Sequence, residues 1–189
     1  MISAILLAAG QSKRMKGENK LIKKIKGVPL IKLTVKNILD SSIDKLIIVL
    51  GYQKEIVKKV IDNSEKIEFV INENFESGMA SSIKVGLSSL PEKTDAFFIC
   101  LGDMPMVNKN ILNLLINSQN NKEIIVPNYN NKKGNPILFS KTMKDKIMNI
   151  DGDLGAKKII KLNKDKVLNI KINDQSIIKN FNTLSDFSS

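Results

Sequence analysis

Short apolar runs and amphipathic stretches alternate along most of this 189-residue chain. The apolar runs have the length and composition of strands, whereas the stretches between them place apolar residues at helical spacing. The predicted strands cover residues 2–8, 45–50, 67–71, 95–101 and 123–127. The predicted helices cover residues 28–40, 53–62, 81–90 and 108–118. Such alternation predicts an α/β fold with a doubly wound, mainly parallel sheet.

The last third of the chain is less regular. Residues 140–150 and 154–163 have helical spacing, residues 166–172 resemble a strand, and the polar segment 128–135 resembles a turn. No repeat or linker interrupts the pattern, and a chain of this length can bury roughly 70 % of its unfolded surface. We therefore expect one domain that covers residues 1–189.

The net charge of +11 is typical of proteins that bind nucleic acid. However, proteins that read bases rely on arginine and on stacked aromatic rings. This chain has 29 lysines but one arginine, with two tyrosines and no tryptophan. We attribute the charge to a compositional bias toward Lys, Asn and Ile, and we expect no nucleic-acid partner.

The sequence shows no sign of a membrane partner. No apolar run approaches the ~20 residues that a membrane span needs. The first ten residues lack the cationic start of a signal peptide. We expect a cytoplasmic protein.

Two missing residue types narrow the chemistry. The chain has no histidine, which excludes a Ser-His-Asp triad, an imidazole base and a His-ligated zinc site. Its one cysteine, Cys100, lies in an apolar run and is expected in the core; a single cysteine forms neither an internal disulfide nor a multi-cysteine metal site. Any metal is therefore expected to be a hard, oxygen-bound cation, which favours magnesium.

Three loops follow predicted strands and should meet at one edge of the sheet. They are residues 9–20, 72–79 and 102–105. In open α/β sheets, ligands bind at the carboxyl ends of the strands, near the point where the strand order reverses. This edge is therefore the predicted binding site.

The first of these loops combines small residues with cations. Four basic residues fall within eight positions, with only Glu18 opposing them. Small residues allow close approach to the backbone, and neighbouring cations favour an anion. The loop matches neither the Walker A pattern nor the three-glycine dinucleotide pattern. An anion-binding loop and a solvated basic loop both remain open from the residues alone.

The other two loops carry further polar signals. Asp103 follows a fully apolar strand, where a metal or phosphate role competes with a plain turn-forming role. Residues 78–82 resemble a helix start, with small residues and hydroxyls that leave amide donors exposed. Helix capping alone would also explain these serines.

Six segments then resemble, in order and spacing, the molybdenum-cofactor nucleotidyltransferases. They are LLAAGQSKRM with Lys20, GMASSIKVGL, GDMP, GNPILF, GDLGAKKI and NFNTLSDF. The match is closest to the molybdenum cofactor cytidylyltransferases and covers nearly the whole chain. The resemblance implies a Rossmann-like fold of the nucleotide-diphospho-sugar transferase type. It also implies transfer of CMP from Mg·CTP to the phosphate of molybdopterin or the molybdenum cofactor, with release of pyrophosphate.

The resemblance also assigns roles to residues. Those placed at the nucleotide are Leu7, Ala8, Ala9, Gly10, Arg14, Lys20, Asn72, Gly78 and Ser81. Those placed at the acceptor are Ser82, Asn135, Pro136 and Asp153. Arg14, Lys20 and Asp103 would act in catalysis, and Asp103 and Asn182 would hold the magnesium. A molybdoenzyme or its chaperone would be a further partner.

The chain departs from the family pattern at three places. Lys16 intervenes before Gly17, where the family has glycine directly after Arg-Met. Asn135 stands where cytidylyl members often have histidine. Asn180 and Asn182 stand where the family often has aspartates. These changes leave open another nucleotide or acceptor, such as a sugar phosphate or methylerythritol phosphate, and a protein that binds without turnover.

Overall fold

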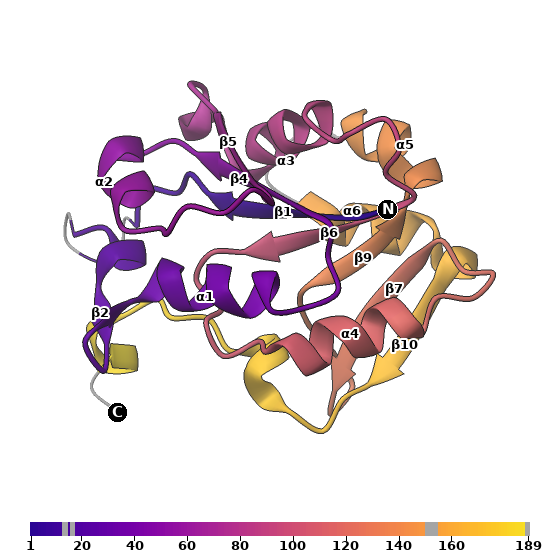
Figure 1. Cartoon of the computed structure of the whole chain (residues 1–189). Coiled ribbons are helices and arrows are strands. Elements are labelled where there is room, and N and C mark those ends of the chain that lie inside the picture. Colours follow the sequence, from indigo (N-terminus) through magenta and orange to yellow (C-terminus); the bar gives the residue numbers. More distant parts are fainter. Residues whose placement is uncertain (13–14, 16–17, 150–154, 188–189) are drawn as a thin grey trace.

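The computed structural model describes residues 1–12, 15, 18–149 and 155–187. Its centre is one mixed sheet of eight strands with helices on both faces (Figure 1). The strand order is β10 (Val167–Lys171), β7 (Ile124–Tyr129), β9 (Ile137–Ser140), β6 (Ala96–Leu101), β1 (Ile2–Ala8), β4 (Lys45–Leu50) and β5 (Ile67–Ile71), with β8 (Lys132–Lys133) beside β7.

The sheet is parallel over most of its width. Strands β6, β1, β4 and β5 run parallel, as do β7 and β10. Strand β9 lies between β6 and β7 and runs antiparallel to both. The prediction of a doubly wound, mainly parallel sheet is confirmed.

Strand β1 shows why the sheet is buried on both faces. Ala4, Ile5 and Leu6 are completely buried. Ala4 and Leu6 belong to one hydrophobic cluster, and Ile5 belongs to the cluster on the opposite face. Because successive side chains of a strand point to opposite faces, an uninterrupted apolar run supplies both layers of core.

The helices divide between these two clusters. Helices α1 (Leu30–Leu39), α2 (Lys54–Lys59) and α4 (Lys109–Asn117) contribute to the cluster that contains Leu6. Helices α3 (Met79–Ser88), α5 (Lys144–Met148) and α6 (Gly155–Leu162) border the cluster that contains Ile5 (Figure 1). Helix α3 lies especially close to the sheet, since a Cβ added at Gly86 would fall 2.3 Å from Ile5.

Short elements complete the chain. The ribbon β2 (Lys24–Ile25) and β3 (Val28–Pro29) precedes α1. The 3₁₀ turns are η2 (Lys20–Ile22), η3 (Phe75–Ser77), η4 (Lys141–Met143), η5 (Lys164–Lys166), η6 (Gln175–Ile178) and η7 (Leu184–Phe187).

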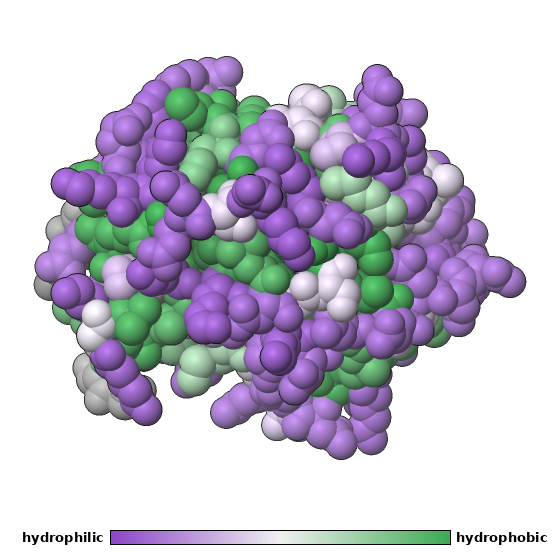
Figure 2. Space-filling view, in the orientation of Figure 1, coloured by the Kyte–Doolittle hydropathy of each residue, from purple (hydrophilic) through white to green (hydrophobic). Residues whose placement is uncertain are grey.

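The surface agrees with the composition. The face seen in Figure 2 is mainly hydrophilic, with smaller hydrophobic patches between the polar side chains. Within the described ranges, no helix has the length and apolar character needed to span a membrane.

The structure differs from the predicted elements at several places. Strand β9 was not predicted, because its four residues follow a polar, turn-like segment and its strand form depends on pairing with β6 and β7. The predicted helix over 140–150 is divided into η4 and the short α5 within the described residues. The helix predicted over 53–62 is only the six residues of α2.

Candidate active site

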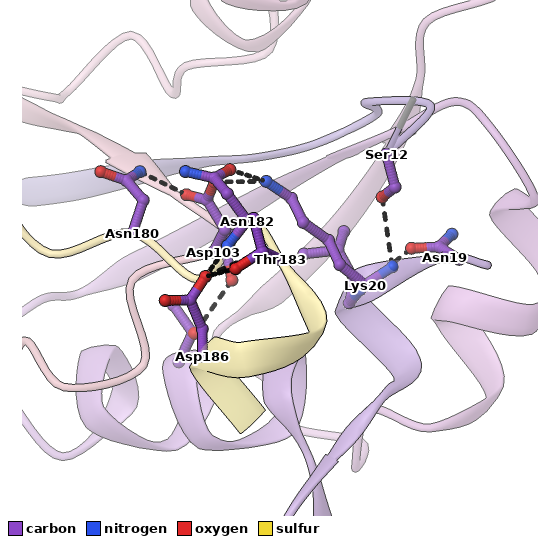
Figure 3. A network of polar contacts seen from close by, with 11 residues as sticks. Ser12, Asn19, Lys20, Asp103, Asn180, Asn182, Thr183 and Asp186 are labelled. Atoms are coloured by element: carbon purple, nitrogen blue, oxygen red, sulfur yellow. Dashed lines mark hydrogen bonds and ion pairs between the residues drawn. The ribbon is translucent and has the colours of Figure 1, made fainter. Parts of the chain in front are cut away.

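Three segments that are distant in sequence meet beyond the carboxyl end of β6 (Figure 3). Lys20 begins η2, Asp103 lies two residues after β6, and Asn182 belongs to the segment that precedes η7. The Lys20 ammonium donates to Asp103 Oδ2 at 2.5 Å and to Asn182 Oδ1 at 2.9 Å. The Lys20 and Asp103 side chains are only 17 % and 14 % exposed. The structure thus brings together three of the predicted site residues.

Local turn geometry fixes the position of Lys20. The backbone N–H of Lys20 donates to Ser12 Oγ at 3.2 Å. Asn19 caps η2 by accepting a hydrogen bond from Leu21 N at 3.0 Å. These contacts hold the backbone of η2 while the long lysine stem extends toward Asp103 (Figure 3).

Asp103 is held from both its side chain and its backbone. Asn180 Nδ2 donates to Asp103 Oδ1 at 2.9 Å. Phe181 N donates to the Asp103 carbonyl at 2.9 Å. The preceding Gly102 donates its N–H to the Leu7 carbonyl, and an added Cβ would fall 2.9 Å from that oxygen. A glycine is therefore needed where the β6 loop turns past β1.

Asp186 fixes the turn that presents Asn182. One of its carboxylate oxygens accepts hydrogen bonds from the backbone N–H groups of Asn182 and Thr183, both at 2.8 Å. It also accepts one from the Thr183 hydroxyl at 2.9 Å. These hydrogen bonds, from Asn182 first, lower the pKa of Asp186 below its ordinary 3.8.

The donor set fits a metal that binds together with a substrate. The oxygens of Asp103 and Asn182 both point at one cation, the Lys20 ammonium. In the described part of the chain, no group of three or more His, Cys, Asp or Glu could hold a metal ion. Magnesium usually takes one or two carboxylates and completes its shell with phosphate oxygens and water. One carboxylate and one amide oxygen match that pattern.

A second group of predicted residues surrounds Asn72, which is 2 % exposed. Asn72 Nδ2 donates to Ser81 Oγ at 2.8 Å and to Ser82 Oγ at 3.0 Å, and its Oδ1 accepts from Asn74 N. Gly78 precedes α3 with φ 109° and supplies no side-chain cap. These contacts join the end of β5 to the start of α3. The roles of Asn72, Gly78 and Ser81 at the nucleotide and of Ser82 at the acceptor stay predictions.

The residues that follow β1 differ in their exposure. Ala8 and Ala9 are 2 % and 4 % exposed, and a Cβ added at Gly51 would fall 2.8 Å from Ala9. Leu7 is half-buried. Gly10 is exposed, and no described residue lies within 4 Å of a Cβ added there. Packing against the described residues does not require a glycine at position 10.

Of the predicted acceptor residues, the structure describes Ser82, Asn135 and Pro136, which make different contacts. Asn135 and Pro136 line a small cavity with Leu101 and Met104, and Asn135 N donates to the Ile177 carbonyl at 2.8 Å. Ser82 instead belongs to the contacts around Asn72. Arg14 and Asp153 lie outside the described residues.

Sequence reasoning did not assign roles to Ser12, Asn180 and Asp186. The C-terminal motif marked Asn180 as a departure from the family, but nothing indicated that its amide would donate to Asp103. Ser12 and Asp186 act by local hydrogen bonds to backbone N–H groups. A carboxylate four residues after Asn182 was the available signal for Asp186.

Comparison with proteins of known sequence gives two results. The model of the MobA-like NTP transferase domain matches residues 4–167. The chain is 25 % identical over 145 residues to the bifunctional protein GlmU of Syntrophomonas wolfei. The alignment covers 76 % of this chain and 32 % of GlmU. The chain thus spans about a third of the length of this curated relative.

Comparison with solved structures supports the same fold. The crystal structure of Rv0371c from Mycobacterium tuberculosis aligns with a TM-score of 0.87, at 24 % identity, over 99 % of this chain and 95 % of that one. A second structure of Rv0371c is a complex with manganese; it has a TM-score of 0.78 at 23 % identity and covers 90 % and 88 % of the two chains.

The third structure is the 4-diphosphocytidyl-2C-methyl-D-erythritol synthase of Anaerococcus prevotii. It aligns with a TM-score of 0.79, at 16 % identity, over 99 % of this chain and 92 % of that one. These structures and the family model, which covers most of the chain, establish the nucleotide-diphospho-sugar transferase fold. This chain belongs to the family of MobA-like NTP transferase domains.

Proposed function

We propose that this protein transfers CMP from CTP to the phosphate of molybdopterin or the molybdenum cofactor and releases pyrophosphate. The observation that carries the proposal is the convergence of Lys20, Asp103 and Asn182 from three separate segments at the carboxyl edge of the sheet. Membership of the NTP transferase family supports nucleotidyl transfer, and the six sequence segments favour the molybdenum-cofactor acceptor.

The transfer step needs alignment and charge neutralisation more than a base. An oxygen of the acceptor phosphate forms a bond to the α-phosphorus of the nucleotide. The bond from that phosphorus to the oxygen bridging the α- and β-phosphates breaks, and pyrophosphate leaves with the electron pair. A phosphate monoester is already anionic near neutral pH, so a chain without histidine can support this step.

The charged residues of the site suit this chemistry. The ammonium of Lys20 reaches the carboxyl edge of the sheet, where it would bind phosphate oxygens and stabilise charge on the leaving pyrophosphate. Asp103 and Asn182 would hold a divalent cation, with Mg²⁺ as the first choice, and that cation would neutralise charge on the triphosphate. The manganese complex of Rv0371c supports a divalent metal in this fold.

The loop after β1 supplies room for the nucleotide. Gly10 is exposed, and no described residue lies within 4 Å of a Cβ added there, so a triphosphate would approach its backbone closely. Arg14, in the same loop, would contact phosphate oxygens. Asn72 would keep the start of α3 beside the ribose or base through its bonds to Ser81 and Ser82.

The choice of CTP rests on Ala8 and Ala9, which would narrow the base pocket against purines. The cytidyl-transferring relative from A. prevotii favours the same base. Competition between CTP and GTP at equal concentration tests this choice, with higher kcat/KM expected for CTP. Equal use of both nucleotides, or a preference for GTP, would refute the cytidylyl assignment while leaving nucleotidyl transfer intact.

A second candidate is nucleotidyl transfer to another phosphorylated acceptor. The departures from the family pattern leave a sugar phosphate open, and the relatives include the methylerythritol enzyme, so a sugar phosphate and methylerythritol phosphate are the acceptors to compare. The decisive assay offers each of the four NTPs with each acceptor, Mg²⁺ or Mn²⁺, and measures pyrophosphate and product mass. Pyrophosphate only with CTP and molybdopterin supports the proposal, and release with another acceptor selects the alternative.

The same assay tests a protein that binds the cofactor without turnover. That alternative is suggested by the amides of Asn180 and Asn182, which add no negative charge to the site. Binding of CTP without release of pyrophosphate in the presence of any acceptor would favour it. The Asp103→Asn variant serves as the control for background hydrolysis.

A further inference from the structure

The Lys20 ammonium lies between the two oxygens that the proposed metal needs. It donates to Asp103 Oδ2 at 2.5 Å and to Asn182 Oδ1 at 2.9 Å (Figure 3). The ion pair is mostly enclosed, because the side chains of Lys20 and Asp103 are 17 % and 14 % exposed. A cation of the protein itself thus neutralises the Asp103 carboxylate.

A divalent cation cannot join this arrangement without repelling Lys20. Magnesium binds oxygen at about 2.1 Å, so an ion on Asp103 Oδ2 would lie within about 4.6 Å of the ammonium. In a site that excludes most water, repulsion between these charges is only weakly screened. The other carboxylate oxygen is engaged by Asn180 Nδ2. A metal on that oxygen would share it with the Asn180 amide.

The lysine side chain is able to leave while its backbone stays in place. Ser12 Oγ and Asn19 hold the start of η2, and the ammonium is carried by a flexible four-carbon stem. A triphosphate at the carboxyl edge would offer that ammonium several anionic oxygens. Departure of Lys20 would then remove its positive charge from beside the oxygens of Asp103 and Asn182.

We propose that Lys20 and a divalent cation compete for Asp103 and Asn182, and that the nucleotide triphosphate ends the competition by binding the ammonium. The nucleotide part rests on the proposed function. Metal alone then binds weakly, and metal and nucleotide strengthen each other's binding by the same factor. Lys20 is thus both a phosphate ligand and the group that keeps free metal out of the site.

The test titrates Mn²⁺ alone into the full-length, nucleotide-free protein and measures free Mn²⁺ by electron paramagnetic resonance. Lys20→Met should bind Mn²⁺ about 10-fold more tightly or better than the unmodified protein, because the competing charge is gone. Combining it with Asp103→Asn should abolish the gain. Lys23→Met is the matched control: Lys23 directly follows η2 and pairs with Glu18 at the surface, so its loss should leave Mn²⁺ affinity unchanged.

A second variant guards against loss of folding. Lys20→Gln keeps a donor near Asp103 but removes the charge, and it should show the same gain in Mn²⁺ affinity. Thermal melts identify any variant that does not fold. The competition would be overturned if folded Lys20→Met or Lys20→Gln bound Mn²⁺ within twofold of the unmodified protein. An Mn²⁺ affinity equal to that of Lys23→Met would overturn it as well.

The two proposals fail separately. The Mn²⁺ titration contains no nucleotide or acceptor, so its result does not depend on transfer. Absence of pyrophosphate release with every acceptor would remove the proposed function and leave a Lys20-dependent Mn²⁺ affinity standing. If the unmodified protein transfers the nucleotide normally and both Lys20 variants keep the Mn²⁺ affinity of the unmodified protein, only the proposed competition is refuted.

Discussion

Two lysine–carboxylate pairs lie at opposite edges of the same sheet. Lys20 and Asp103 meet beyond the carboxyl end of β6, whereas Lys166 and Glu123 meet where β10 and β7 begin. The second pair ties the starts of two adjacent parallel strands, and Glu123 N also donates to the Lys166 carbonyl at 3.1 Å. The first pair joins loops that share no strand pairing.

The surroundings of the two pairs distinguish the candidate active site from an ion pair that only holds two strands together. Lys166 and Glu123 are 30 % and 27 % exposed, against 17 % and 14 % for Lys20 and Asp103. Glu123 takes its other side-chain hydrogen bond from Thr142, directly beyond the end of β9. Asp103 takes its other bond from Asn180, on a loop 77 positions away. Convergence of loops, more than the presence of a salt bridge, identifies the candidate active site.

The largest expected effect belongs to Asp103. Asp103→Asn should lower the rate of nucleotidyl transfer by roughly 10²-fold or more, because it removes the one carboxylate that would hold the metal. Steady-state kinetics over a range of Mg²⁺ concentrations measure the loss. Glu123→Gln is the matched change at the other edge and should retain the rate. A near-normal rate for Asp103→Asn at limiting Mg²⁺ would show that the Lys20–Asp103 pair, like the Lys166–Glu123 pair, has only a structural role.

Gly134→Ala tests whether the C-terminal segment must be placed accurately. A Cβ at Gly134 would fall 2.5 Å from the carbonyl oxygen and 2.9 Å from the Cβ of Ile177. Relief of this overlap should cost about 1–3 kcal/mol of unfolding free energy. It should also move the nearby segment that carries Asn180 and Asn182, and so lower kcat. Denaturant unfolding and kinetics together check this; unchanged values in both would show that the segment adapts freely.

The sequence predicted the half of the sheet around β1 better than the half around β9. Strands β1, β4 and β5 have the predicted bounds because each is a short, mostly apolar run. Strand β9 has four residues and depends on neighbours far along the chain. In the site, Asp103 stood out because a charge follows a buried strand. The role of Asn180 could not be predicted, since its bond to Asp103 exists only once the C-terminal segment has folded back.

A smaller effect is expected at Arg14, which lies outside the described residues, so the prediction rests on the sequence. Arg14 is the single guanidinium among 29 lysines. Lysine keeps its charge but cannot make a two-point contact with a phosphate. Arg14→Lys should lower kcat/KM for the nucleotide about 10-fold, on the order of 1.4 kcal/mol. Lys13→Ala is the control and should cost much less; equal small losses would make this loop a solvated basic surface.

The smallest effect is expected at Glu123. The hydrogen bond from Lys166, and then that from Thr142, lowers the pKa of Glu123 below its ordinary 4.5. Because the folded carboxylate has the lower pKa, its stabilisation is fully present above about pH 4.5 and is lost as the pH falls through the folded pKa. A partly exposed pair contributes little, so Glu123→Gln should lower the Tm by only about 2 °C at pH 7. Thermal melts of both proteins from pH 7 to pH 3 should show this difference shrink on acidification. A difference in Tm that grows toward pH 3 would contradict the assignment of Glu123 as a charged group that stabilises the contact between β7 and β10.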